Sequence, residues 1–153
     1  GRVMQLAEDV DSKKILTIGG YGTGEVVEKP DVFGATTTEK VKEDHEDLEI
    51  VFDNDVGQIV GISGLLIGRA KENEVEGICL LGETPGFLLS DPKSTENVLK
   101  IMEQILDLDL DYNQLEDKVE ESQDVLKKLQ NMKKKQKPDD DQKGQGGDLG
   151  YIG

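Results

Sequence analysis

The fold is decided by two neighbouring stretches, Gly61-Ile62-Ser63-Gly64-Leu65-Leu66-Ile67-Gly68 and Glu76-Gly77-Ile78-Cys79-Leu80-Leu81-Gly82. The first lies within residues 58–71, where apolar side chains fall on several faces, and this pattern predicts a buried helix. Glycine costs up to about 1 kcal/mol at each site inside a helix. We therefore expect Gly61, Gly64 and Gly68 to allow close packing of the helix backbone on a sheet. The second stretch is a continuous apolar run between glycines, which is typical of a buried strand.

Further strands are predicted before this unit, at residues 14–18, 32–37 and 48–52, and residues 39–45 predict one or two helical turns. Strands that alternate with helical segments form βαβ units. The sequence therefore predicts an α/β fold with a largely parallel sheet flanked by helices. Residues 3–10 have the pattern of an amphipathic helix that begins without a capping residue, so we expect sequence to be missing upstream.

A helical hairpin is predicted after residue 90. Asp91 as N-cap and Pro92 at the first helical position mark the start of one helix, and residues 107–111 break its period. A second helix is predicted over residues 112–132, with apolar positions at alternating spacings of four and three. This seam consists of Leu115, Val119, Ser122, Leu126 and Leu129. About two heptads are too few to stand alone in water, so this helix packs on the preceding helix or on another subunit.

The last residues, 133–153, have a polar and glycine-rich composition that cannot bury enough surface to order itself. They nevertheless end with three apolar residues, Leu149, Tyr151 and Ile152, which make either a docking peptide or an ordinary disordered end. The predicted organisation is thus residues 1–90 as the C-terminal part of an α/β domain, 91–132 as the hairpin packed on it, and 133–153 as a flexible tail.

Composition excludes several classes of function. Acidic residues outnumber basic residues by 33 to 18, and the formal net charge is -15 at pH 7, whereas nucleic acids and anionic membranes attract positive charge. The single cysteine, Cys79, cannot form an internal disulfide. No run approaches the roughly 18 apolar residues of a membrane span. We expect a cytoplasmic protein with neither nucleic acid nor membrane as a partner.

The glycine-rich residues 19–24 suggest an enzyme, because glycine loops after strands can bind phosphate through backbone amides. The spacing of these glycines is not that of a dinucleotide-binding loop, and Pro30 stops any helix that follows the loop. Glu25 and Glu28, which follow the loop, would repel phosphate. We expect instead a turn that folds closely against the sheet. His45, the sole histidine, lies among acids and predicts a solvated face rather than a zinc site, and a buried Cys79 is expected to be inert. The sequence predicts no catalytic residue, metal site or cofactor.

Three stretches taken together resemble a known family. They are Ile18-Gly19-Gly20-Tyr21-Gly22-Thr23-Gly24, then Gly61-Ile62-Ser63-Gly64-Leu65-Leu66-Ile67-Gly68, then Leu80-Leu81-Gly82-Glu83-Thr84-Pro85-Gly86 with Asp91-Pro92-Lys93-Ser94. In this order they are similar to the archaeal branch of the proteasome assembly chaperone family, over residues 1–130. The resemblance implies an α/β sandwich like that of nucleoside phosphorylases without their catalysis, and a further N-terminal part of the domain.

The resemblance also implies homo-oligomers that bind proteasome α-subunits or other client proteins without ATP. Some chaperones and activators of this system end in a hydrophobic residue, a tyrosine and any residue. Here Tyr151 stands one position earlier, and Gly150 precedes it. The residues we predict to bind partners are Leu149, Tyr151 and Ile152 in the tail and Leu115, Val119, Leu126 and Leu129 in the seam. Two other hypotheses stay open: a phosphorylase-like or ligase-type enzyme that binds phosphate or nucleotide at residues 19–24, and a structural oligomer without a client.

Overall fold

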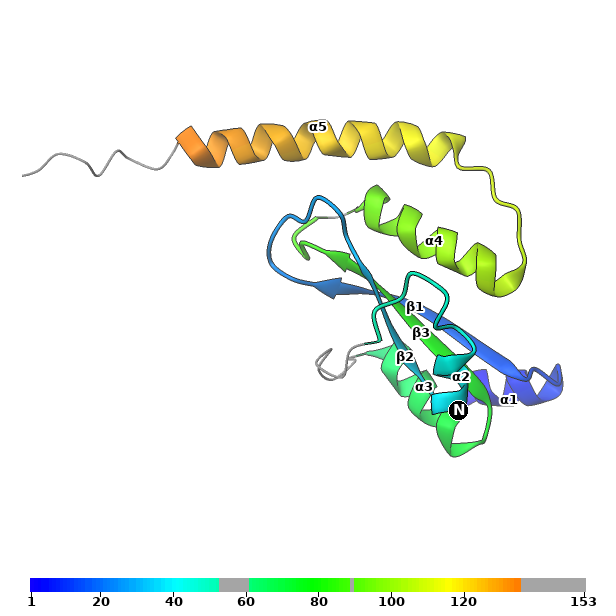
Figure 1. Ribbon diagram of the computed structural model, residues 1–153. Coiled ribbons are helices and arrows are strands. Elements are labelled where there is room, and N and C mark those ends of the chain that lie inside the picture. The colour runs from blue at the N-terminus through cyan, green and yellow to red at the C-terminus, as the bar shows by residue number, and fades with distance from the viewer. Residues whose placement is uncertain (53–60, 89, 136–153) are drawn as a thin grey trace, which may run out of the picture.

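A computed structural model describes residues 1–52, 61–88 and 90–135 of the chain (Figure 1). The start of the predicted helix at 58–60 and the tail beyond residue 135 lie outside the described residues. The elements are, in order, α1 (Arg2–Asp9), β1 (Lys14–Gly22), β2 (Val32–Thr36), α2 (Glu39–Glu43), α3 (Ile62–Glu72), β3 (Glu76–Thr84), α4 (Pro92–Leu106) and α5 (Asn113–Lys135).

The described strands form one mixed sheet in the order β1-β3-β2. β1 runs parallel to β3, with Lys14 beside Glu76. β2 runs antiparallel to β3, with Val32 beside Gly82. The prediction of a largely parallel sheet is therefore correct for β1 and β3 and wrong for β2. A strand that runs parallel to β1 in the same sheet needs a crossover connection of a dozen or more residues. Because the connection from β1 to β2 is shorter than this, β2 runs in the opposite direction.

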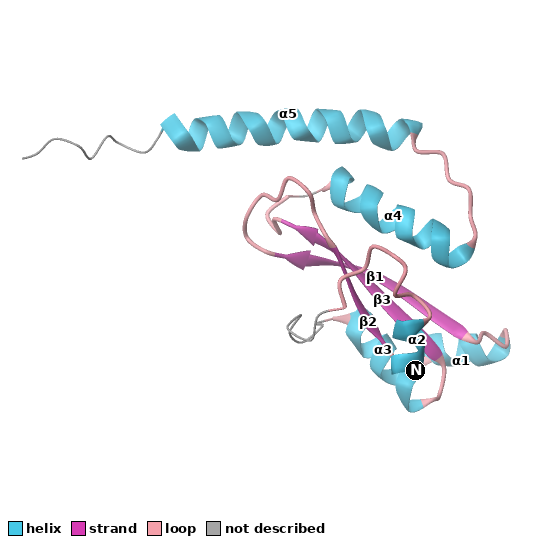
Figure 2. Cartoon of the chain, in the orientation of Figure 1, coloured by secondary structure: helices cyan, strands magenta, loops and turns pink. Residues whose placement is uncertain are grey.

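β3 is the centre of the core because both of its faces are buried. Figure 2 shows α4 on one side of the sheet and α3 on the other. Ile78 and Leu80 pack in one cluster with Val98 of α4, whereas Cys79 and Leu81 pack in a second cluster with a side chain of α3. Successive side chains of a strand point to opposite faces, so an unbroken apolar run is what a strand between two helical layers requires. The prediction of a buried strand here is confirmed.

Two glycines show where the backbone needs this residue. A Cβ on Gly82 would lie 2.3 Å from Oγ of Ser94, so glycine allows α4 to approach the sheet closely. Gly61 caps α3 with a φ of 97°, a conformation that glycine adopts without steric cost. In contrast, a Cβ on Gly68 would meet no atom within 4 Å outside its own stretch of helix. A Cβ on Gly61 would likewise meet nothing within 4 Å, so the prediction that these glycines allow close packing on the sheet is wrong for Gly61 and for Gly68.

α3 is buried on one face only. Ile67 and Ala70 are buried, whereas Ile62 is 70% and Leu65 62% exposed. The prediction of a helix buried all round is therefore wrong. The sheet covers a single face of α3, and an apolar pattern does not reveal whether another element covers the second face.

Residues 48–52 do not form the predicted strand. Val51 makes one isolated bridge to Phe33 of β2, and the backbone before it turns too tightly for a ladder, with the N–H of Ile50 donating to the carbonyl of Leu48. Side chains of this segment pack against the core cluster below α4. Their apolar character therefore reflects burial against a sheet edge and not strand pairing.

The glycine-rich stretch is not a loop as predicted, because β1 continues as far as Gly22. Gly20 pairs with Gly82 and Gly22 pairs with Thr84 in the parallel ladder. Pairing along this length satisfies backbone hydrogen bonds that a loop would leave to solvent. The turn begins only with Thr23, whose N–H donates to the carbonyl of Thr84 at 2.9 Å.

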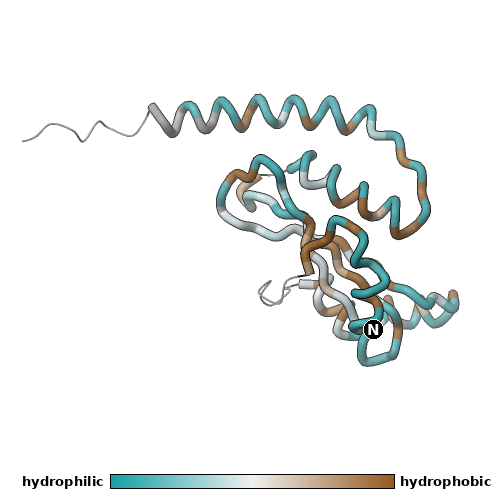
Figure 3. The backbone as a smooth tube through the Cα atoms, in the orientation of Figure 1, coloured by the Kyte–Doolittle hydropathy of each residue, from teal (hydrophilic) through white to brown (hydrophobic). Residues whose placement is uncertain are grey.

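The helical hairpin is present as predicted. The Asp91 side chain accepts a hydrogen bond from the N–H of Ser94 at 3.1 Å, and Pro92 is the first residue of α4. α5 runs back along α4 (Figure 1) and is mostly polar, with apolar residues at intervals (Figure 3). Val119 is buried. None of the described helices is both long and apolar enough to cross a membrane.

Candidate functional site

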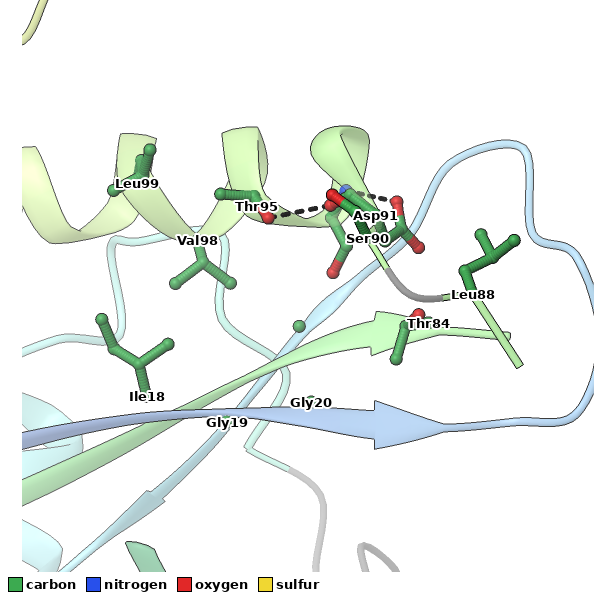
Figure 4. A pocket seen from close by; sticks show the side chains of 12 residues that line it. Ile18, Gly19, Gly20, Thr84, Leu88, Ser90, Asp91, Thr95, Val98 and Leu99 are labelled. Atoms are coloured by element: carbon green, nitrogen blue, oxygen red, sulfur yellow. Dashed lines mark hydrogen bonds between the residues drawn. The ribbon is translucent and has the colours of Figure 1, made fainter. Parts of the chain in front are cut away.

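A cavity of about 340 Å³ lies between the glycine-rich end of β1 and the first turns of α4 (Figure 4). It is at the carboxyl ends of the parallel strands, where open α/β sheets commonly bind ligands. Its apolar lining comes from Ile18, Leu88, Val98 and Leu99, and its polar lining from Thr84, Ser90, Asp91, Ser94 and Thr95. Gly19, Gly20 and Gly82 complete the wall.

The charges of this cavity oppose phosphate binding. The carboxylate of Asp91 occupies the N-terminus of α4, which is the place where a helix attracts an anion. The hydroxyl of Thr95 donates to the carbonyl of Asp91 at 2.8 Å, as drawn in Figure 4. No lysine, arginine or histidine is among the described residues that line the cavity. A phosphate would therefore meet hydroxyl groups and a carboxylate, but no cationic side chain of the described lining.

The reactive side chains lie apart from this cavity. Cys79 is fully buried, and burial raises the pKa of its thiol. His45 is half-buried rather than solvated, and its Nδ1 lies 2.6 Å from the carbonyl oxygen of Val41. Within the described parts of the chain, no three His, Cys, Asp or Glu side chains come together as a metal site.

The predicted seam residues lie on α5. Val119 is buried, and Leu115 and Leu126 are half-buried, so the described part of the seam contributes to the hairpin itself. Leu129 belongs to α5, but its side chain is outside the described part. Leu149, Tyr151 and Ile152 also lie outside the described residues. A role of these residues in partner binding stays a prediction.

The corner of the hairpin depends on Glu103, which the sequence analysis did not single out. Its carboxylate accepts hydrogen bonds from the hydroxyl of Tyr112 at 2.6 Å and from the N–H of Leu110 at 2.6 Å. The bond from Tyr112 is the main reason why the pKa of Glu103 is lowered. Burial and the bond to Glu103 raise the pKa of Tyr112 to about 12. The turn at residues 107–111 brings these groups together, so the hydrophobic periodicity of the sequence could not predict their contact.

Exposed apolar side chains on α1 and on its C-cap residue Val10 are a second feature that sequence analysis did not identify as functional. Val3 is 46%, Leu6 60% and Val10 65% exposed, whereas Met4 is buried. Their spacing is typical of a helix face that another surface covers. The described residues leave this face open.

The fold and its cavity define a mixed α/β domain that carries a helical hairpin after its central strand. The model of the PAC2 family matches residues 1–130, and the chain belongs to this family.

Relatives with known structures share the arrangement. The archaeal proteasome activator PbaB of Pyrococcus furiosus is 31% identical with a TM-score of 0.76, and the match covers 85% of this chain and 56% of PbaB. PbaA of the same organism, an archaeal homolog of proteasome-assembly chaperone, is 24% identical with a TM-score of 0.71, over 88% of this chain and 56% of PbaA.

A further relative is similar over nearly the whole chain. An uncharacterized protein of Methanocaldococcus jannaschii is 29% identical over 157 aligned residues, which cover 99% of this chain and 58% of that protein. The chain therefore spans little more than half the length of these relatives.

Proposed function

We propose that this chain acts in the cytoplasm as a proteasome assembly chaperone-like protein. In this role it forms homo-oligomers and binds proteasome α-subunits or other client proteins without ATP. The observation that carries the proposal is the similarity to PbaB, an archaeal proteasome activator, at 31% identity over 85% of this chain. Membership of the PAC2 family over residues 1–130 agrees with it.

Exposed apolar residues support contacts with other proteins. Besides the open face of α1, Leu106 is 48%, Leu108 46% and Val125 53% exposed on the hairpin. Full burial of such a side chain contributes about 1.5–3 kcal/mol, so a few of them suffice for a protein interface. We assign the α1 face to contacts between copies of the chain, and the hairpin with the tail to the client.

A binding experiment tests the client contact. Immobilised proteasome α-rings are titrated with the full chain and with a variant that lacks residues 149–153. We expect the deletion to weaken binding at least tenfold. A matched control replaces Gln142 and Gln145 with alanine and leaves the apolar tip intact. Unchanged affinity of the deletion variant would remove the tail from the proposal, and no binding by either chain would refute the client assignment.

Sedimentation velocity tests the oligomer. Replacement of Leu6 by lysine places a charge on the exposed α1 face, whereas replacement of Lys71 on the exposed surface of α3 by alanine serves as a control. We expect the first change alone to reduce the sedimentation coefficient. A chain that is monomeric before any substitution would contradict self-association.

The rival function is an enzyme that binds phosphate or nucleotide at residues 19–24. The Asp91 carboxylate and the lack of any cationic side chain among the described cavity residues weigh against it. Titration calorimetry with ATP, with a nucleoside and with phosphate separates the two functions. Saturable heat that Gly20→Val abolishes would favour the enzyme.

A further inference from the structure

The cavity between β1 and α4 contains a serine that is almost fully buried and has a hydroxyl without a partner. Ser94, in the first turn of α4, is 6% exposed and lines the cavity. Its Oγ is the atom nearest to the place where a Cβ on Gly82 would lie, and Gly82 is part of the cavity wall. Within the described residues this hydroxyl forms no hydrogen bond. Because buried polar groups almost always have a partner, an unpaired one that faces a cavity points to a ligand.

Other polar groups of the same wall also have hydrogen-bonding capacity to spare. The hydroxyls of Thr84 and Ser90 form no hydrogen bond within the described residues. The Asp91 carboxylate accepts the N–H of Ser94 through Oδ1, which leaves Oδ2 to accept a hydrogen bond from a ligand. Figure 4 shows Ser90 and Asp91 at the start of α4, with Thr84 across from them on β3. Since each hydroxyl can both donate and accept, this wall suits a ligand that offers both kinds of group.

The charges of the cavity favour a ligand without net charge. The carboxylate of Asp91 repels anions, and no cationic side chain is among the described residues of the lining. The positive end of the α4 dipole lies at the same place and opposes a cation. Ile18, Val98 and Leu99 add apolar surface, and Figure 4 shows them to the left of the polar groups. The cavity therefore combines hydroxyl partners at one end with a surface for C–H groups at the other.

We propose that this cavity binds a neutral polyhydroxylated ligand, a sugar or a cyclic polyol. Hydroxyls of the ligand donate to Oδ2 of Asp91 and exchange hydrogen bonds with the hydroxyls of Ser94 and Thr84, while its C–H groups pack against the apolar side chains. The volume of about 340 Å³ is near the lower end of the range for small-molecule sites, roughly 300–1,000 Å³. A single ring therefore fits better than an extended chain. The binding goes beyond the proposed chaperone-like function and does not depend on it.

Amide NMR spectra of the full chain, titrated separately with D-glucose, D-ribose and myo-inositol, test the proposal. For ligands of this size we expect dissociation constants of roughly 1–10 mM and shifts confined to residues 18–20, 82–84 and 90–99. Tetrahydropyran, a ring without hydroxyls, should give no saturable shift. Glucose 6-phosphate should bind several times more weakly than glucose, because Asp91 repels its phosphate. The proposal would be overturned if none of the three neutral probes gave a saturable shift up to about 100 mM, or if tetrahydropyran bound equally well.

Variants of the wall show whether the named groups hold the ligand. Asp91→Asn retains the helix cap, because asparagine caps as well as aspartate, but replaces the free oxygen by an NH₂ donor. We expect it to weaken binding of the neutral probe about tenfold and to narrow the difference from glucose 6-phosphate. Ser94→Ala should weaken binding about fivefold.

A matched pair of substitutions gives the control. Thr84→Val removes a hydroxyl of the cavity without touching α4 and should weaken binding about fivefold. Thr36→Val makes the same change beside Ile78 on β2, outside the cavity lining, and should leave the affinity unchanged. Circular dichroism identifies the variants that fold. Native affinity in every folded variant of the wall, or an equal loss in Thr36→Val, would overturn the assignment of the ligand to this cavity.

Discussion

Replacement of Gly82 by alanine is expected to disturb the contact between β3 and α4. The added Cβ would lie 2.3 Å from Oγ of Ser94, 3.0 Å from Cγ2 of Val98 and 3.5 Å from the carbonyl oxygen of Ser94. Ser94 is 6% and Val98 5% exposed, so the added atom would meet side chains that are almost fully buried. Overpacking of a core costs about 1–3 kcal/mol. We expect Gly82→Ala to lower the free energy of unfolding by about 2 kcal/mol, and the melting temperature by about 4–8 °C.

Gly68→Ala is the matched control. The same atom added at position 68 would meet open space, and alanine is favoured over glycine within a helix by about 1 kcal/mol. Urea unfolding followed by circular dichroism should therefore move the two midpoints in opposite directions. Ser94→Ala in the Gly82→Ala background removes the nearest clashing atom and should recover part of the loss. If Gly82→Ala unfolds at the midpoint of the native chain, the close approach of α4 is refuted.

Three further outcomes are expected. The pKa of Glu103 is lowered in the folded chain, so the ionised carboxylate stabilises the fold above the unfolded pKa, and this stabilisation is lost as the pH falls through the folded pKa. Between about pH 5 and 3 the urea midpoint of the native chain should therefore fall more than that of Glu103→Gln. Cys79 should react with a chromogenic disulfide reagent only after unfolding, and fast reaction of the folded chain would contradict its burial. Thr37→Val should cost about 1–3 kcal/mol, because the N–H of Gly77 loses its acceptor Oγ1 at 2.9 Å, while Thr37→Ser should retain most of the stability.

Some elements could be predicted because one local signal specifies each of them. Asp91 followed by Pro92 marks the start of α4, since the cap and the proline both act within a single turn. β3 was predictable because a strand that is buried on both faces needs no polar alternation.

Other elements depend on contacts that no local pattern encodes. Residues 48–52 have the composition of a strand but lie against the edge of β2, where only Val51 forms a bridge. The direction of β2 depends on the length of its connection to β1 and not on its own residues. Gly68 and Gly82 are the same residue, yet a Cβ would clash at Gly82 and meet open space at Gly68. The residue type alone does not indicate which side of a helix or strand another element covers.

The candidate site divides in the same way. The seam positions Leu115, Val119 and Leu126 followed from the heptad spacing, and they lie in the hairpin. Glu103 could not be found, because its partner Tyr112 follows nine residues later across a turn. The tail residues lie outside the described part of the chain, so their assignment to a partner stays a prediction.

The three-point contact of Glu103, Tyr112 and Leu110 also gives the hairpin a mechanical property. It sits at the base of α5, a rod of 23 residues, or about 35 Å at 1.5 Å per residue. A tilt of about 10° at this base would swing the far end by about 6 Å, given the rise per residue of a helix. The two hydrogen bonds at the base of α5 therefore help to fix the direction of this helix and hence the position of its far end.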